Sequence, residues 1–191
     1  NRSRHWPGWN ATQLVGVELW DKNLGILGMG RIGQAIAHRA RAFGMTIHYH
    51  NRHRLTAELE DGALYHTDFA DLAAAADALM VAAQSSATTK HYLDAARIAR
   101  LKPGAIVCNV ARGDLIDDNA LIASLTDGRV HAAGLDVFEN EPKIDPRYYD
   151  LPTVFMLPHI GSSTIETRRR MARALIQGLR VWLAGAQPAN R

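Results

Sequence analysis

The sequence predicts an α/β fold built on a doubly wound parallel sheet. Two observations support this prediction. Short apolar runs alternate with amphipathic segments along most of the 191 residues, as in strands joined by helical crossovers. The crossovers of such a sheet are right-handed and place helices on its faces. A glycine-rich stretch, "GMGRIG" at residues 28–33, joins the first apolar run to the first amphipathic segment.

The apolar runs have the length of strands; "NLGILG" is predicted to be a strand and "GAIVCNV" a buried strand. Each is separated from the next by a segment long enough for a crossover, which indicates parallel pairing. We expect strands at residues 23–28, 45–50, 63–67, 76–83, 104–110, 130–138 and 153–158.

The helix after the first strand carries apolar residues at the spacing of one helical face and stops at Gly44. An Ala-rich helix leads into the strand at 76–83. Two more helices are expected at 93–101 and 117–125, the second with Asp117 as its N-cap and Gly128 past its end.

The last helix is predicted to open with Ser163 and Glu166, which have the spacing of a capping box. Its apolar positions are expected to face the core, and they are Met171, Leu175, Leu179 and Trp182. The Trp-rich start of the chain, residues 1–20, is expected to form a helix or an arm that packs on the domain or on a partner.

The composition excludes several classes of protein. Hydrophobic residues make up 47% and charged residues 21%, which indicates a globular domain and not a disordered chain. The net charge of +3 is spread over several elements, so we expect no nucleic acid as partner. No apolar run reaches the ~18 residues of a membrane span. The single cysteine, Cys108, lies in an apolar run, which favours a reducing, cytoplasmic location.

The stretch "GMGRIG" matches the G-x-G-x-x-G pattern, which is weak evidence alone but is expected between a strand and a helix. Gly28 would allow the tight turn, Gly30 would let the backbone approach a pyrophosphate, and Gly33 would let helix and strand pack closely. The helix N-terminus would offer N–H groups to the phosphates. A tight turn without a ligand is the alternative. We favour a Rossmann-type NAD(P)-binding domain.

The end of the second strand has an unusual charge pattern. An acid normally accepts hydrogen bonds from the ribose of NAD at this place. Here the position holds Asn51, followed by Arg52 and Arg54, which would suit the 2′-phosphate of NADP(H). We therefore expect NADP(H) to be preferred, with NAD(H) possible. Solvated arginines at a surface strand end are the alternative.

A metal site is a further reading of the same stretch, because His48 and His50 share one strand face. No cysteine or acid within the stretch completes a ligand set, so we expect no metal.

Arg112, Glu141 and His159 each lie beyond the end of an expected strand, where ligands bind in open α/β sheets. Each alone would more often be an ordinary surface residue. Together they suit the reduction of a keto acid. A guanidinium holds the carboxylate, an imidazole exchanges a proton with the carbonyl oxygen, and a neighbouring carboxylate orients that imidazole and favours its charged form.

Along nearly its whole length, the sequence resembles the D-isomer-specific 2-hydroxyacid dehydrogenase family. The motifs are "LGILGMGRIGQAIA", "LKPGAIVCNVARGDLIDDNALIASL", "GLDVFENEP" and "LPHIGSSTIETR". Within the family it looks most like the bacterial glyoxylate/hydroxypyruvate reductase branch, which includes 2-ketogluconate reductases. Ala87 departs from the proline that is common in the family.

The resemblance implies a role for each matching residue. Arg112 would bind the substrate, Glu141 would support the histidine, and His159 would be the general acid/base. The implied cofactor contacts include Asp136 near the nicotinamide carboxamide and Arg31 and Ile32 beside the pyrophosphate. We also assign Val110, at the end of the strand 104–110, to the cofactor site.

The resemblance also implies a second domain, which completes the substrate cleft in the family. We expect residues 1–191 to be the dinucleotide-binding domain alone, with the substrate domain absent. The expected activity is reduction of a small 2-keto acid to the D-2-hydroxy acid by NADPH, in a homodimer with Trp6 and Trp9 as candidate contacts. An NAD(H)-sensing, corepressor-like binding protein on the same fold is the alternative.

Overall fold

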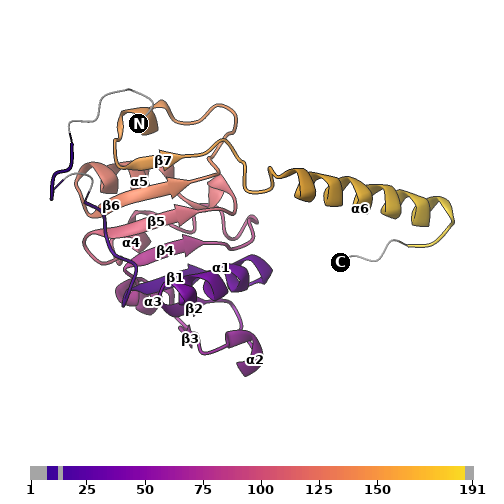
Figure 1. The fold of residues 1–191 in the computed structure, drawn as a ribbon, viewed down its shortest axis with the longest axis horizontal. Helices are drawn as coiled ribbons and strands as arrows, with labels where there is room; N and C mark the ends of the chain where they lie inside the picture. The colour runs from indigo at the N-terminus through magenta and orange to yellow at the C-terminus, as the bar shows by residue number, and fades with distance from the viewer. Residues whose placement is uncertain (1–7, 13–14, 188–191) are drawn as a thin grey trace.

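The computed structural model describes residues 8–12 and 15–187, and in them seven parallel strands form one sheet in the order β3-β2-β1-β4-β5-β6-β7 (Figure 1). This confirms the doubly wound sheet. The chain winds outward from β1 through β2 to β3, then returns to β4 and winds the other way. The carboxyl ends of β1 and β4 therefore flank the crevice where such sheets bind their ligands. The strands are β1 Asn23–Leu27, β2 Thr46–His50, β3 Leu64–Tyr65, β4 Ala78–Val81, β5 Ala105–Asn109, β6 Val130–Leu135 and β7 Val154–Met156.

The helices fall where the sequence predicts them, with three differences. The segment 93–101 is a single turn, the short α2 was not expected, and two 3-10 turns lie in the loops after β5 and before β7. Asp117 caps α5 as predicted, because its carboxylate accepts from the amides of Asn119 and Ala120. The helices are α1 Arg31–Ala42, α2 Ala57–Glu60, α3 Phe69–Ala75, α4 Ala95–Ile98, α5 Asp118–Thr126 and α6 Ile165–Leu183, and the turns are η1 Gly113–Leu115 and η2 Pro146–Asp150.

Two apolar clusters cover the two faces of the sheet. On one face α1 packs on β1 and β2, and Ile26 and Ala37 are fully buried there. On the other face α3, α4 and α5 cover the centre of the sheet around Leu79 and Val107, which are also fully buried. Burying each large apolar side chain contributes roughly 1.5–3 kcal/mol. This two-sided burial fixes the strand ends that carry the site.

The last helix corrects the sequence prediction. Figure 1 shows α6 extending away from the sheet, and none of its residues is buried. Met171, Leu175, Leu179 and Trp182 are all more than half exposed. The apolar spacing is real, but periodicity shows only which face of a helix is apolar, not what covers it. The apolar stripe of α6 is therefore left uncovered by the described residues.

The cap of α6 is also one residue from the predicted place. Thr164, not Ser163, is the N-cap, and its hydroxyl accepts from the amide of Thr167. No helix in the part of the chain that the structure describes is long and apolar enough to cross a membrane.

The described part of the N-terminal segment has neither helix nor strand, so the predicted helix is absent from residues 8–12 and 15–20. Trp9 is exposed, whereas Trp6 lies outside the described residues. Trp20 lies against Gly44 at the end of the turn after α1, where a side chain on residue 44 would collide with its indole ring.

Candidate active site

The glycine turn connects β1 to α1 at the carboxyl edge of the sheet. Gly28 has a φ of 98°, and a Cβ on it would lie 2.5 Å from the backbone of Ala83 in the loop after β4. A Cβ on Gly33 would lie 2.5 Å from the carbonyl oxygen of Gly28. Both positions therefore require glycine for packing. A Cβ on Gly30 would meet no atom within 4 Å, so the space in front of this residue is open.

The start of α1 suits a phosphate. Gly30 is its N-cap and supplies no side chain to the free amides of the first turn, which contains no acidic residue. Such amides and the helix dipole favour an anion. Arg31 and Ile32, both exposed, begin the helix beside this opening. The cradle therefore fits the pyrophosphate of a dinucleotide.

Asn51 is part of the glycine turn in the fold. Its Oδ1 accepts a hydrogen bond of 2.7 Å from the amide of Met29, and the amide of Gly28 donates to the carbonyl of His50. Since an amide oxygen is occupied in this way, the side chain has its NH₂ group left to donate to a cofactor. Asn51 thus supports the turn as well as replacing the usual acid.

Arg54 does not project freely from the loop, which departs from the expectation that it would be available to a phosphate. Its guanidinium makes a two-point contact with Glu60, at 2.8 and 3.1 Å, and the carboxylate of Glu60 also accepts from the buried hydroxyl of Tyr49. The hydrogen bonds from Arg54 and Tyr49, more than the opposing effect of burial, hold the pKa of Glu60 below its usual range. Arg52 is exposed as Arg54 is, but it has no ion pair within the described ranges.

The hydrogen-bonded cluster of Tyr49, Arg54 and Glu60 can be tested through Tyr49. Burial and the hydrogen bond to Glu60 raise the pKa of Tyr49 to about 12. The unfolded chain has a tyrosine pKa of about 10. The raised pKa of Tyr49 contributes to the free energy of unfolding, and this contribution is fully present below pH ~10. It is lost as the pH rises from ~10 to ~12, by up to ~1.4 kcal/mol per pH unit. We expect Tyr49→Phe to be less stable than the wild type at pH 8 and to differ less at pH 11. Urea unfolding at both values measures this, and an unchanged difference would contradict it.

The histidines of the second strand have partners in the protein. The imidazoles of His48 and His66 lie 2.9 Å apart between Nδ1 and Nε2, and His50 contacts the carbonyl of His66 and the hydroxyl of Tyr92. Burial and the neighbouring His66 lower the pKa of His48. Among the residues that the structure describes, no group of three or more His, Cys, Asp or Glu is placed to hold a metal ion.

Glu141 and His159 meet at the carboxyl edge. Nδ1 of His159 lies 2.7 Å from Oε2 of Glu141, while Oε1 of Glu141 accepts from the amide of Phe138 at 2.7 Å. Burial works to raise the pKa of Glu141, but the hydrogen bonds from His159 and Phe138 outweigh it and lower the pKa. An ionised carboxylate only accepts, so Nδ1 carries a proton in this contact, and Nε2 has no hydrogen-bond partner among the described residues. His159 is half exposed, at 50% of its side chain.

Asp136 holds the segment that follows the histidine. Its two carboxylate oxygens accept from the amides of Ile160 and Gly161 at 2.7 and 2.8 Å, and the residue is buried. His159 itself has a φ of 53°, in the left-handed region that favours glycine. The Asp136 contacts stabilise this conformation. This is a role in addition to the nicotinamide contact that the resemblance implies.

Arg112 lies in the loop after β5, next to Val110, which is also exposed. Buried Asn109 shapes this loop, since its side chain accepts from the amide of Ala111 and donates to the carbonyl of Arg112. The Arg112 guanidinium donates to the carbonyl of Ala111 and not to Glu141 or His159. This role of Asn109 is not predictable from the sequence, because a polar residue inside an apolar run gives no sign of a loop contact.

The Arg112 loop and the Glu141 segment are in direct backbone contact. A Cβ on Gly113 would overlap the carbonyl carbon of Phe138, so only glycine fits between them. A pocket of about 450 Å³ borders Glu141 and His159, and Phe138, Ile144, Tyr149, Met156 and Leu157 provide most of its apolar wall. An apolar pocket with a few convergent polar groups is typical of a small-molecule site.

Comparison with known proteins gives a consistent result. The family model of the D-isomer specific 2-hydroxyacid dehydrogenase NAD binding domain matches residues 1–161. Glyoxylate/hydroxypyruvate reductase B from Enterobacter agglomerans is 45% identical over 187 residues, 96% of this chain and 56% of the relative.

Two solved structures have the same fold. A protein from Polaromonas described as a D-isomer specific 2-hydroxyacid dehydrogenase is 53% identical with a TM-score of 0.95, over 99% of this chain and 59% of the other. The NADPH-dependent glyoxylate/hydroxypyruvate reductase of Sinorhizobium meliloti, in complex with NADP and malonate, is 37% identical with a TM-score of 0.81, over 85% and 50%. The chain thus spans little more than half the length of the relatives it matches.

Proposed function

Because the chain belongs to the D-isomer specific 2-hydroxyacid dehydrogenase family through its NAD-binding domain, we propose that it carries the cofactor site and the proton-transfer pair of an oxidoreductase. The proposed reaction is reduction of a small 2-keto acid, of the glyoxylate or hydroxypyruvate type, to the D-2-hydroxy acid. The observation that supports it most is the 2.7 Å contact between His159 and Glu141 at the ligand-binding edge of the sheet.

The residues of the chain divide the chemistry among them. Arg112 would hold the substrate carboxylate, since a guanidinium offers two parallel donors. Protonated His159 would donate from Nε2 to the carbonyl oxygen as negative charge develops there. Glu141 keeps Nδ1 protonated and aims the ring. When bound, the reduced nicotinamide supplies the hydride.

NADP(H) is the proposed cofactor, with NAD(H) as a weaker one. Three features of the loop after β2 support this. The usual acid is replaced by Asn51, no carboxylate is paired with Arg52 among the described residues, and Glu60 on α2 is already occupied by Arg54. The Sinorhizobium relative, which carries NADP in its structure, supports the same choice.

We also propose that these residues form one of two domains in the working enzyme, since the relatives are nearly twice as long. Closure of a second domain over the cleft would exclude water and orient the substrate. Residues 1–191 alone are then expected to bind cofactor but turn over poorly. Equal rates for this segment and for a two-domain protein would contradict the proposal.

The test of function is a panel of 2-keto acids assayed with NADPH and with NADH. The proposed function requires substrate-dependent oxidation of NADPH with glyoxylate or hydroxypyruvate. Cofactor binding without turnover on any keto acid, together with capture of peptide ligands, would favour the NAD(H)-sensing alternative.

A homodimer in the cytoplasm is the proposed state of the protein. The exposed apolar stripe of α6 and the exposed Trp9 are surfaces that a second copy would cover. The lone Cys108, whose pKa is raised by burial, suits a reducing compartment. Sedimentation analysis should give twice the monomer mass, and a monomer would exclude the dimer.

A further inference from the structure

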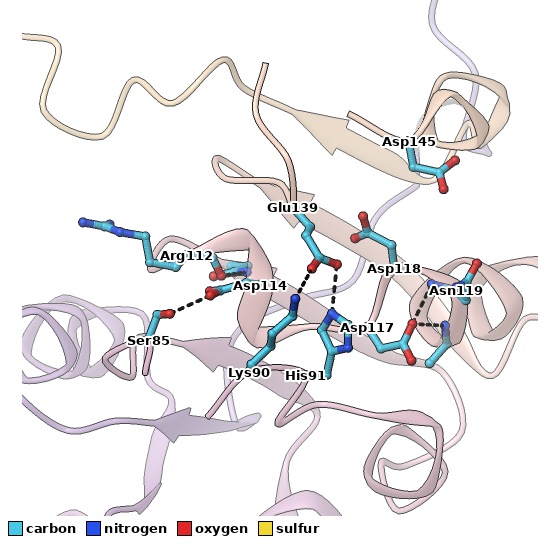
Figure 2. Close-up of polar contacts among 12 residues, drawn as sticks. Ser85, Lys90, His91, Arg112, Asp114, Asp117, Asp118, Asn119, Glu139 and Asp145 are labelled. Carbon is cyan, nitrogen blue, oxygen red and sulfur yellow. Dashed lines mark hydrogen bonds and ion pairs between the residues drawn. The ribbon is translucent and has the colours of Figure 1, made fainter. Parts of the chain in front are cut away.

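A group of charged residues near the Arg112 loop has no part in the proposed chemistry. Figure 2 shows Lys90 and His91 directed at Glu139, and Ser85 at Asp114, while Arg112 points away from them. The carboxylate of Glu139 lies 2.9 Å from Nε2 of His91 and 3.3 Å from Nζ of Lys90. These contacts join two segments that are 48 residues apart in sequence.

Residues 84–93, in the loop after β4, are hydrogen-bonded to the Arg112 loop. The amide of His91 donates to the carbonyl of Asp114 at 2.7 Å, and the hydroxyl of Ser85 donates to the carboxylate of Asp114 at the same distance. Leu93 and Leu115 are joined by a further backbone hydrogen bond. Residues 84–93 are therefore held by hydrogen bonds to the turn that follows Arg112.

Glu139 connects this unit to the acid that supports the histidine. Glu139 follows Phe138, whose amide holds Oε1 of Glu141. Gly113 packs on the carbonyl of Phe138 from the other side. The position of Phe138 is thus set by the Arg112 turn on one side and by the Glu139 contacts on the other. A shift of Phe138 would release Glu141 and, through it, His159.

The side chain of Glu139 is mostly buried and is held by both of its partners. Its side chain is only 18% exposed, and His91 adopts a φ of 50° to reach it. Burial works to raise the pKa of Glu139, but the hydrogen bonds from His91 and Lys90 outweigh it and lower the pKa. Surface ion pairs with mobile side chains contribute little, whereas a mostly buried carboxylate that is paired with Lys90 and hydrogen-bonded to His91 orders both loops.

We propose that Glu139 is a positioning residue, which ties the loop after β4 and the Arg112 turn to the segment that carries Glu141 and His159. This inference rests on the proposed function. Glu139 does not touch the reacting atoms, so its loss should lower kcat through misplacement of His159. Cofactor affinity should change much less than kcat, since neither partner of Glu139, His91 or Lys90, belongs to the glycine turn.

The test compares Glu139→Ala and Glu139→Gln with Asp145→Ala in the two-domain protein. Asp145 is a matched control, because its side chain is 22% exposed and pairs with Arg147 without contacting Glu141 or His159. We expect Glu139→Ala to lower kcat by about tenfold, since misplacement by a fraction of an ångström is costly. The Kd for NADPH should change less than about twofold. Glu139→Gln should recover most of the rate, because its amide oxygen still accepts from His91.

Two further measurements keep the test decisive. If Glu139→Ala does not fold, His91→Asn removes one donor while tolerating the left-handed backbone, and it should lower kcat in the same way. If the wild type shows no turnover, the proposed function fails. The inference is then tested by the ring resonances of His159 in this chain, which should move in Glu139→Ala and not in Asp145→Ala. Glu139 and Asp145 variants that behave alike in these measurements would overturn it.

Discussion

Replacing His159 with asparagine is expected to lower kcat for reduction of glyoxylate by about 10²- to 10⁴-fold, the usual contribution of a general acid. Asparagine can still donate to Glu141 but has no proton to give to the developing alkoxide. The Kd for NADPH should be unchanged, because none of the contacts around the glycine turn involves His159. Steady-state kinetics and a cofactor titration measure the two effects.

The matched control is His38→Asn, on the exposed face of α1. This variant should retain the kcat of the wild type. If His159→Asn kept more than about a tenth of the rate, the proton would have another source, and the assignment of His159 as general acid would be wrong.

Replacing Arg52 with alanine is expected to raise the Kd for NADPH by about 10- to 150-fold and to leave the Kd for NADH nearly unchanged. The range corresponds to the ~1.5–3 kcal/mol of a charge-assisted hydrogen bond. The structure separates Arg52, which is exposed and has no ion pair in the described part of the chain, from Arg54, which is held by Glu60. Isothermal titration of this chain measures both constants.

Arg54→Ala is the matched control, since it removes the same charge from the same loop. Its effect on the Kd for NADPH should be several times smaller than that of Arg52→Ala. An equal loss of affinity would mean that Arg54 leaves Glu60 when the cofactor binds. A wild-type preference for NADH would refute the reading of the loop altogether.

The sequence was sufficient for the fold and for the pairing of Glu141 with His159. Parallel strands bring their carboxyl ends to one edge, so residues just beyond "DVF" and "MLP" come together although they are 18 residues apart. The glycine turn was equally predictable, since the strand and helix around it follow from apolar spacing. These features depend on local patterns that the fold then assembles.

The remaining features depend on partners that no local pattern indicates. Arg54 appeared free because α2, which carries Glu60, is a single turn without a clear apolar period. The apolar face of α6 was assigned to a core that lies elsewhere. The contacts of Glu139 join distant segments, and His91 has a left-handed backbone conformation that no local sequence pattern indicates.

The configuration of the product tests the central claim most directly. Hydroxypyruvate would be reduced with NADPH by the two-domain protein, and the glycerate formed would be resolved by chiral chromatography. The account predicts D-glycerate, formed in proportion to the NADPH consumed. Formation of L-glycerate, or oxidation of NADPH without glycerate, would contradict the roles given to Arg112, Glu141 and His159.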